Sequence, residues 1–167
     1  DKIIIASKFC KDEFYPGHLS MAAKKKDYIK SVEGSLARLK TDYLDYCLVH
    51  AIGEMSANYK KEKQRLFNED LFSAVDQLKK DGKIKHLAVS SHGPSNLVSL
   101  LNDAVDSGHY DLIMPAFNFM RYPQLKGVIK NAYKKNVAVV AMKTLAGARD
   151  IKLDPKGEDF AKAAFKW

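Results

Sequence analysis

The sequence predicts an α/β protein in which five parallel strands alternate with helices. Short apolar runs rich in β-branched residues recur along the chain, and segments with apolar residues at three- and four-residue spacing separate them. Such alternation implies a parallel sheet with right-handed crossovers. It fits an open doubly wound sheet or part of a closed barrel, and periodicity alone does not choose between the two.

The five strands are expected to be buried because each is a nearly continuous apolar run. Their lengths are typical of strands, whereas helices need longer periodic segments. In chain order they are Ile3 to Ala6, Leu44 to Val49, Ile84 to Val89, Asp111 to Met114, and Val137 to Met142.

Helical patterns fill the intervals between these runs. The clearest spans Asp27 to Lys40, where Tyr28, Val32 and Leu36 fall on one face and polar residues on the other. Further apolar stripes begin at Leu71, Leu97 and Leu125. Each stripe can cover one face of the sheet.

The composition is that of a folded protein with one hydrophobic core. The chain has 167 residues, of which 46% are hydrophobic and 29% are charged. We therefore expect a single domain over residues 1–167. No apolar run reaches the roughly 18 residues of a membrane span, and the first residues lack the zones of a signal peptide. These features predict a cytoplasmic protein with no membrane partner.

The net charge of +8 raises the question of an anionic partner. The basic residues are dispersed over several segments, as on solvated helix faces, so nucleic acid is not an expected partner. A phosphate-bearing small molecule is compatible with this charge. Cys10 and Cys47 belong to no CxxC pair and no Cys/His spacing, so no metal site is expected.

Polar side chains follow every expected strand, where the ligands of parallel α/β proteins gather. In chain order these are Lys8, His50, Ser90 and Ser91, Asn118, and Lys143 and Thr144. A purely structural protein has little need for polar groups at one rim of a sheet. The pattern therefore predicts a ligand site there.

Three stretches resemble the aldo-keto reductase family. They are Ile3 to Lys8, Ser35 to His50, and Gly82 to His92. The central stretch carries the pattern SLxRLxxDYxDxxLxH between a helix and a strand. The resemblance implies a (β/α)8 TIM barrel whose third to seventh strands lie in this chain. It also implies an oxidoreductase that transfers hydride from NADPH to the carbonyl carbon of a small aldehyde or ketone.

The resemblance assigns two catalytic residues. The family uses Asp, Tyr, Lys and His at the barrel mouth, where the tyrosine gives a proton to the carbonyl oxygen. Lys8 matches the lysine, whose charge lowers the tyrosine pKa from about 10. His50 matches the histidine that orients the carbonyl group. The resemblance places the family's aspartate and tyrosine on a second strand and its loop, before Asp1, so the segment alone is expected to be inactive.

The resemblance also implies contacts to the nicotinamide of NADPH. Ser90 and Ser91 match a pair whose polar groups bind the carboxamide. Met114 stands where the family usually has glutamine, and Met142 stands where an aromatic residue often stacks on the ring. A thioether can still pack on a flat ring, so Met142 can take the place of the aromatic residue. Both methionines are candidate cofactor contacts, and both also fit the hydrophobic core, which is the preferred interpretation for Met114.

Two residues after the fifth strand are candidate contacts to the cofactor's phosphates. The resemblance places Lys143 and Thr144 near the pyrophosphate, which a lysine and backbone amides can bind. The family's contacts to adenine and the 2'-phosphate follow an eighth strand. The preference for NADPH over NADH is therefore implied by the resemblance alone.

The number of strands predicts that the chain is an excerpt of a longer protein. A barrel of this kind needs eight strands and typically about 250 residues, and five strands are expected here. Asp159 to Trp167 has the pattern of the helix that would precede an eighth strand. We therefore expect an incomplete barrel with its terminal strands missing.

Two other functions stay open. The departures at Met114 and Met142 also fit a family member that has lost catalysis and acts as a binding or regulatory subunit. An unrelated barrel lyase would use Lys8 or Lys143 to form a Schiff base. The sequence predicts neither the substrate nor the oligomeric state.

Overall fold

The computed structural model of the chain describes residues 3–10, 18–93, 95–118 and 123–145. Within these ranges the strands are β1 (Ala6–Phe9), β2 (Leu44–Val49), β3 (Ile84–Ser91), β4 (Leu112–Pro115) and β5 (Ala138–Val139). The helices are α1 (Lys25–Leu39), α2 (Tyr59–Leu66), α3 (Glu69–Lys80), α4 (Leu97–Asp106) and α5 (Leu125–Lys134). Asp159 to Trp167 lies outside the described residues.

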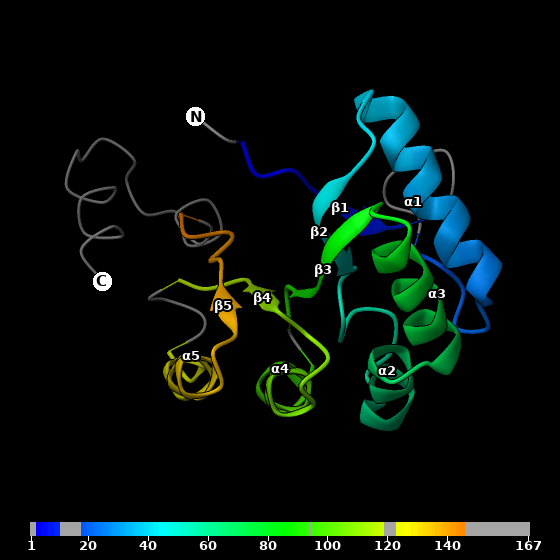
Figure 1. Cartoon of the computed structure of the whole chain (residues 1–167). Helices are drawn as coiled ribbons and strands as arrows, with labels where there is room; N and C mark the ends of the chain where they lie inside the picture. Colours follow the sequence, from blue (N-terminus) through cyan, green and yellow to red (C-terminus); the bar gives the residue numbers. More distant parts are fainter. Residues whose placement is uncertain (1–2, 11–17, 94, 119–122, 146–167) are drawn as a thin grey trace.

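The strands form one parallel sheet in the order β1-β2-β3-β4-β5, so each pairs with its neighbours along the chain. The helices lie on one face of this curved sheet (Figure 1), and the main core fills the space between them. The other face carries a small cluster of Leu48, Ala88 and Leu112, against which Tyr46 and Met114 pack. A doubly wound sheet has helices on both faces, whereas a barrel wall has them outside only. The described residues therefore form part of a (β/α)8 barrel, as expected.

Short polar side chains start the helices near their expected positions. The backbone N–H of Lys24 donates to the Asp27 carboxylate over 2.8 Å, so α1 begins two residues before the predicted start. Asn58 and Asn68 accept from the first turns of α2 and α3. Lys40 takes the left-handed conformation that ends α1.

The first strand differs from the prediction. It spans Ala6–Phe9 rather than Ile3 to Ala6, and the side chains of Ile3 and Ile4 are 81% and 70% exposed. The reason is packing. Helix α1 packs on the end of Ala6–Phe9 and not on Ile3 or Ile4. The Phe9 ring contacts the Tyr28 ring of α1, with 5.4 Å between the ring centroids.

The remaining differences lie at the ends of elements and in α2. Strand β3 continues through Ser91, and β5 is reduced to Ala138–Val139, with a separate bridge from Ala116 to Met142. Helix α2 was not predicted, because its sequence is almost entirely charged or polar. Its two buried charged residues, Glu62 and Arg65, lie on the buried side of the helix together with Leu66.

Candidate active site

The strand register places several predicted residues on the face of the sheet away from the helices. Register partners in a sheet point to the same face, and successive residues alternate between faces. Lys8 pairs with Leu48 and therefore lies on this inner face. Ser90 pairs with Met114, also on the inner face. By the same alternation His50, two residues after Leu48, follows on that face at the carboxyl end of β2.

The structure brings Lys8 and His50 together. His50 is 4% exposed, and the pKa of its imidazole falls from 6.5 to about 4. Burial is the largest cause, and the nearby rings and charges of His18 and Lys8 add to it. His50 is therefore a neutral imidazole near pH 7, beside the ammonium group of a half-buried lysine.

Two further histidines and one glutamate surround His50. The His18 ring lies 4.7 Å from the His50 ring between centroids, and its own pKa is lowered, mainly by burial. The His92 imidazole hydrogen-bonds to the Glu54 carboxylate. The sequence gives His18 and the stretch Ala51 to Tyr59, which contains Glu54, as possible pocket residues, without assigning either a role.

The backbone after His50 is held by buried side chains. Arg65 donates to the His50 and Ala51 carbonyl oxygens over 2.6 and 3.2 Å. The N–H of Gly53 donates to the Glu62 carboxylate over 2.8 Å. Sequence reasoning missed both charged residues; their spacing of three residues on one helix was the only available signal.

Ser90 and Ser91 point to opposite faces of the sheet. The Ser90 hydroxyl lies on the inner face and accepts a hydrogen bond from the Ala51 N–H at 3.1 Å. The Ser91 hydroxyl points toward the helices and donates to the Ile52 carbonyl at 2.6 Å. Both side chains are fully buried. The structure therefore gives the two predicted cofactor contacts different surroundings, and Ser91 holds the chain after β2.

The remaining predicted cofactor contacts follow β4 and β5. Met114 is half-buried on the inner face, and Met142 is half-buried beyond the end of β5, next to Ala116. Lys143 is exposed, and its carbonyl oxygen accepts from the Asn118 amide at 3.3 Å. Thr144 begins a turn. A flat ring fits a face with a hydroxyl and two thioethers, and an exposed lysine beside it suits a phosphate.

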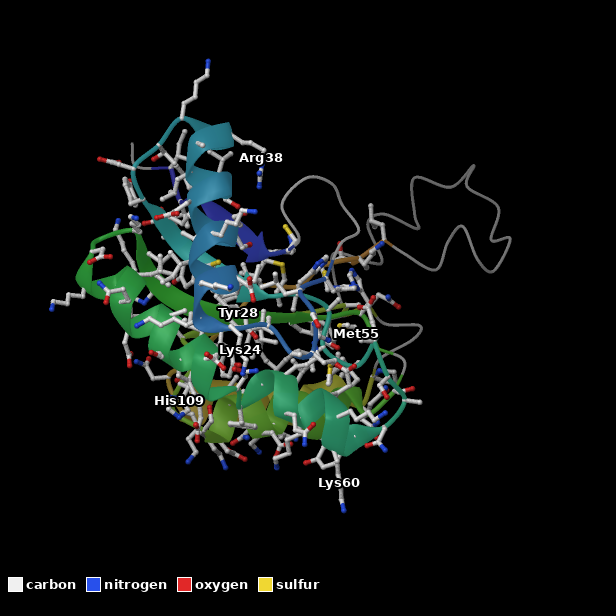
Figure 2. The ribbon with its side chains drawn as sticks, turned by 90° about the vertical axis from the view of Figure 1, so that its right-hand side faces the viewer. Lys24, Tyr28, Arg38, Met55, Lys60 and His109 are labelled. Atoms are coloured by element: carbon white, nitrogen blue, oxygen red, sulfur yellow. The ribbon has the colours of Figure 1, made fainter. Side chains whose placement is uncertain are left out.

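The opposite end of the sheet is occupied by structural contacts. Figure 2 shows His109, before β4, at the amino ends of the strands, and Met55, after β2, at their carboxyl ends. Near the amino ends, the Asp45 carboxylate accepts from the Ile5 N–H and the Lys85 ammonium, both over 2.8 Å. These bonds give Asp45 a structural role at this end of the sheet.

No helix among residues 3–10, 18–93, 95–118 and 123–145 is long and apolar enough to cross a bilayer. In the same ranges, no three His, Cys, Asp or Glu side chains are grouped so that they would hold a metal ion.

The parallel sheet has helices on one face and polar residues at the carboxyl ends of its strands. This is the architecture of part of a (β/α)8 barrel, in which sites lie at that end. The aldo/keto reductase family model matches residues 1–160. The chain belongs to the aldo/keto reductase family. The resemblance that the sequence motifs carried is thus confirmed, and the alternative of an unrelated lyase is wrong.

Individual relatives show which share of a family member's length this chain covers. A glyoxal reductase of Bacillus subtilis is 38% identical over 76 residues, which make up 46% of this chain and 24% of that protein. A protein assigned as an aldo-keto reductase in Pseudomonas aeruginosa superposes with a TM-score of 0.70 at 25% identity, over 98% of this chain and 55% of its own. The holo form of an aldo-keto reductase from Bacillus halodurans gives a TM-score of 0.62 at 21% identity, over 93% and 46%. The chain spans about half the length of these solved relatives.

Proposed function

We propose that the protein carrying this chain reduces the carbonyl group of a small aldehyde or ketone with NADPH. The observation that carries the proposal is the convergence of Lys8 and His50 on the inner face, close enough for the lysine charge to lower the histidine pKa. Membership in the aldo/keto reductase family supports the same reaction class.

The proposed roles follow from the charge states of the two side chains. Because the pKa of His50 is about 4, its neutral ring donates an N–H hydrogen bond to the carbonyl oxygen and orients it. The Lys8 ammonium stabilises the negative charge that develops on that oxygen. No residue of this chain is assigned the role of proton donor, which the family gives to a tyrosine.

We propose that the cofactor lies along Ser90, Met114, Met142 and Lys143. When bound, NADPH supplies the hydride. The Ser90 hydroxyl would contact the carboxamide, the two thioethers would pack on the ring, and Lys143, with the turn at Thr144, would bind the phosphates. Ser91 would not contact the cofactor directly. Its hydroxyl donates to the Ile52 carbonyl and so holds the chain after β2.

Turnover of NADPH by the full-length protein tests the proposal. Glyoxal is the first substrate to try, because one relative is a glyoxal reductase; other aldehydes and ketones follow. We expect carbonyl-dependent loss of NADPH absorbance. A second candidate, a cofactor-binding subunit without catalysis, is favoured by the thioethers of Met114 and Met142. Tight NADPH binding with no reduction of any carbonyl compound would support it instead.

A further inference from the structure

We infer that Arg65 and Glu62, two buried residues of α2, position His50 for carbonyl binding. The inference rests on the proposed function, because it concerns the same histidine. Neither residue faces the inner side of the sheet, so they are positioning residues and not catalytic ones. Their effect on the reaction passes through the backbone that carries the imidazole.

The first step is the burial of the ion pair. Glu62 is 0% exposed and Arg65 is 9% exposed, and Nη1 of Arg65 lies 2.8 Å from Oε2 of Glu62. Removing two charges from water costs free energy that apolar side chains of the same size do not incur. Stability alone therefore does not explain an ion pair at this position. The other hydrogen bonds of Arg65 and Glu62 offer an explanation.

Those contacts all go to residues 50–53. Nη2 of Arg65 donates to the His50 carbonyl and Nη1 donates to the Ala51 carbonyl, so one guanidinium binds two successive peptide groups. The Glu62 carboxylate accepts from the Gly53 N–H. The planar, rigid fork of arginine suits such a paired contact, whereas a lysine presents one point charge.

The turn held in this way has an uncommon backbone. Ala51 has a φ of 53° and Gly53 a φ of 89°, both in the left-handed region. A Cβ at Gly53 would lie 2.7 Å from the Ser95 carbonyl oxygen, so the chain passes very close to its neighbour. Because the Arg65 contacts fix the peptide between His50 and Ala51, they also fix the direction in which the His50 side chain leaves the strand.

Strand β3 holds the same turn from the other side. The Ala51 N–H donates to the Ser90 hydroxyl, the Ser91 hydroxyl donates to the Ile52 carbonyl, and the Ile52 N–H donates to the Ser90 carbonyl. Six backbone groups of residues 50–53 are therefore bound by α2 and β3. This pattern predicts that loss of the α2 contacts tilts the imidazole without unfolding the sheet.

The test compares variants of α2 in the full-length protein. Arg65→Lys keeps the charge and loses the paired contact, Arg65→Met removes both, and Glu62→Gln weakens the contact to Gly53. The control is Tyr110→Phe, which removes a buried hydrogen bond of 2.7 Å to the Leu66 carbonyl of the same helix. The measurements are Tm, kcat and KM for carbonyl reduction, and the NMR signals of the His50 ring, assigned with His50→Gln.

We expect Arg65→Lys to lower kcat about 10-fold, with KM for NADPH changed less than about twofold, because misplaced catalytic groups act on the reaction step. The His50 ring signals should move in the same variant. Tyr110→Phe should lower Tm and leave kcat and these signals unchanged. Equal behaviour of Arg65→Lys and Tyr110→Phe would overturn the inference, as would full activity of Arg65→Lys, because charge alone would then suffice.

Two outcomes separate this inference from the proposed function. If the wild-type protein reduces no carbonyl compound, the proposed function fails, and movement of the His50 signals in Arg65→Lys alone decides the inference. If Arg65→Met does not fold, Arg65→Lys and Glu62→Gln decide it, since both keep the volume and polarity of the buried site. Unchanged His50 signals in both would overturn it.

Discussion

The chain segments that follow β2 and β5 lie at the same end of the sheet and are built in opposite ways. After β2, buried side chains bind the backbone groups of residues 50–53 one by one. After β5, strand-type backbone bonds hold the chain instead: the Met142 N–H donates to the Pro115 carbonyl and the Phe117 N–H donates to the Met142 carbonyl, both over 3.0 Å. The side chain of Lys143 is exposed beyond these bonds, and its carbonyl accepts from the Asn118 amide. Catalytic groups need fixed geometry, whereas a flexible lysine suits a mobile phosphate. The comparison indicates that the proposed carbonyl site is preorganised and that the proposed phosphate site forms around its ligand.

The largest effect is expected at the preorganised site. Lys8→Met and His50→Gln should each lower kcat about 100-fold or more, because each removes a group that acts on the carbonyl oxygen. Steady-state kinetics of NADPH oxidation measures this. Lys134→Met, on the exposed face of α5, is the matched control and should keep kcat near the wild-type value. If either site variant retains kcat within about twofold, the assigned role is wrong.

The two serines after the strand offer the next comparison. Ser90→Ala should raise the Kd of NADPH about 10-fold and also lower Tm, because it removes an inner-face hydroxyl that accepts from the Ala51 N–H. Ser91→Ala should change this Kd less than about twofold and should lower Tm, because its hydroxyl binds the Ile52 carbonyl on the other face. Fluorescence titration and thermal melting measure the two quantities. A similar loss of cofactor affinity in both variants would contradict the division between faces.

The buried histidine predicts a pH dependence of stability. The pKa of His50 is about 4 in the folded chain and about 6.5 when unfolded, so the unfolded state binds more protons between these values. Stability should therefore fall as pH drops from about 6.5 to about 4, by roughly 1 kcal/mol after allowance for solvent screening. His50→Gln should reduce this slope, and His18 should leave a smaller one. Denaturant unfolding at several pH values measures it; an unchanged slope in the variant would count against burial of a neutral ring.

The smallest effect is expected after β5. Lys143→Met should weaken NADPH binding about threefold, as for an exposed ion pair, and added salt should shrink the difference. The exposed Lys134 of α5 provides the control, because Lys134→Met should leave the Kd unchanged. A 100-fold rise in the Kd of NADPH in Lys143→Met would show that the segment after β5 is as preorganised as the one after β2.

The sequence predicted the parts of the fold that repeat and missed those that depend on single contacts. Alternating apolar runs and helical stripes predicted β2, β3 and β4 closely, because burial between sheet and helices imposes that pattern. Ile3 and Ile4 misled the prediction, since their apolar side chains lie outside the packed region. Helix α2 was missed because its packing depends on an ion pair that no apolar spacing reveals.

The same distinction applies to the site. The stretches Ile3 to Lys8 and Ser35 to His50 gave the positions of Lys8 and His50, and alternation along the paired strands sends both side chains to one face. It did not separate Ser90 from Ser91, although adjacent strand residues must point to opposite faces. The contacts of Arg65 with the chain after β2 were not predictable, because they join residues that only the turn brings together.

The central claim is that Lys8 and His50 lie beside each other on the inner face. NMR titration of the His50 ring in the wild-type protein and in Lys8→Met tests it most directly. The account predicts a pKa of about 4 in the wild type and a higher value once the lysine charge is removed. A pKa near 6.5 that is the same in both proteins would contradict it.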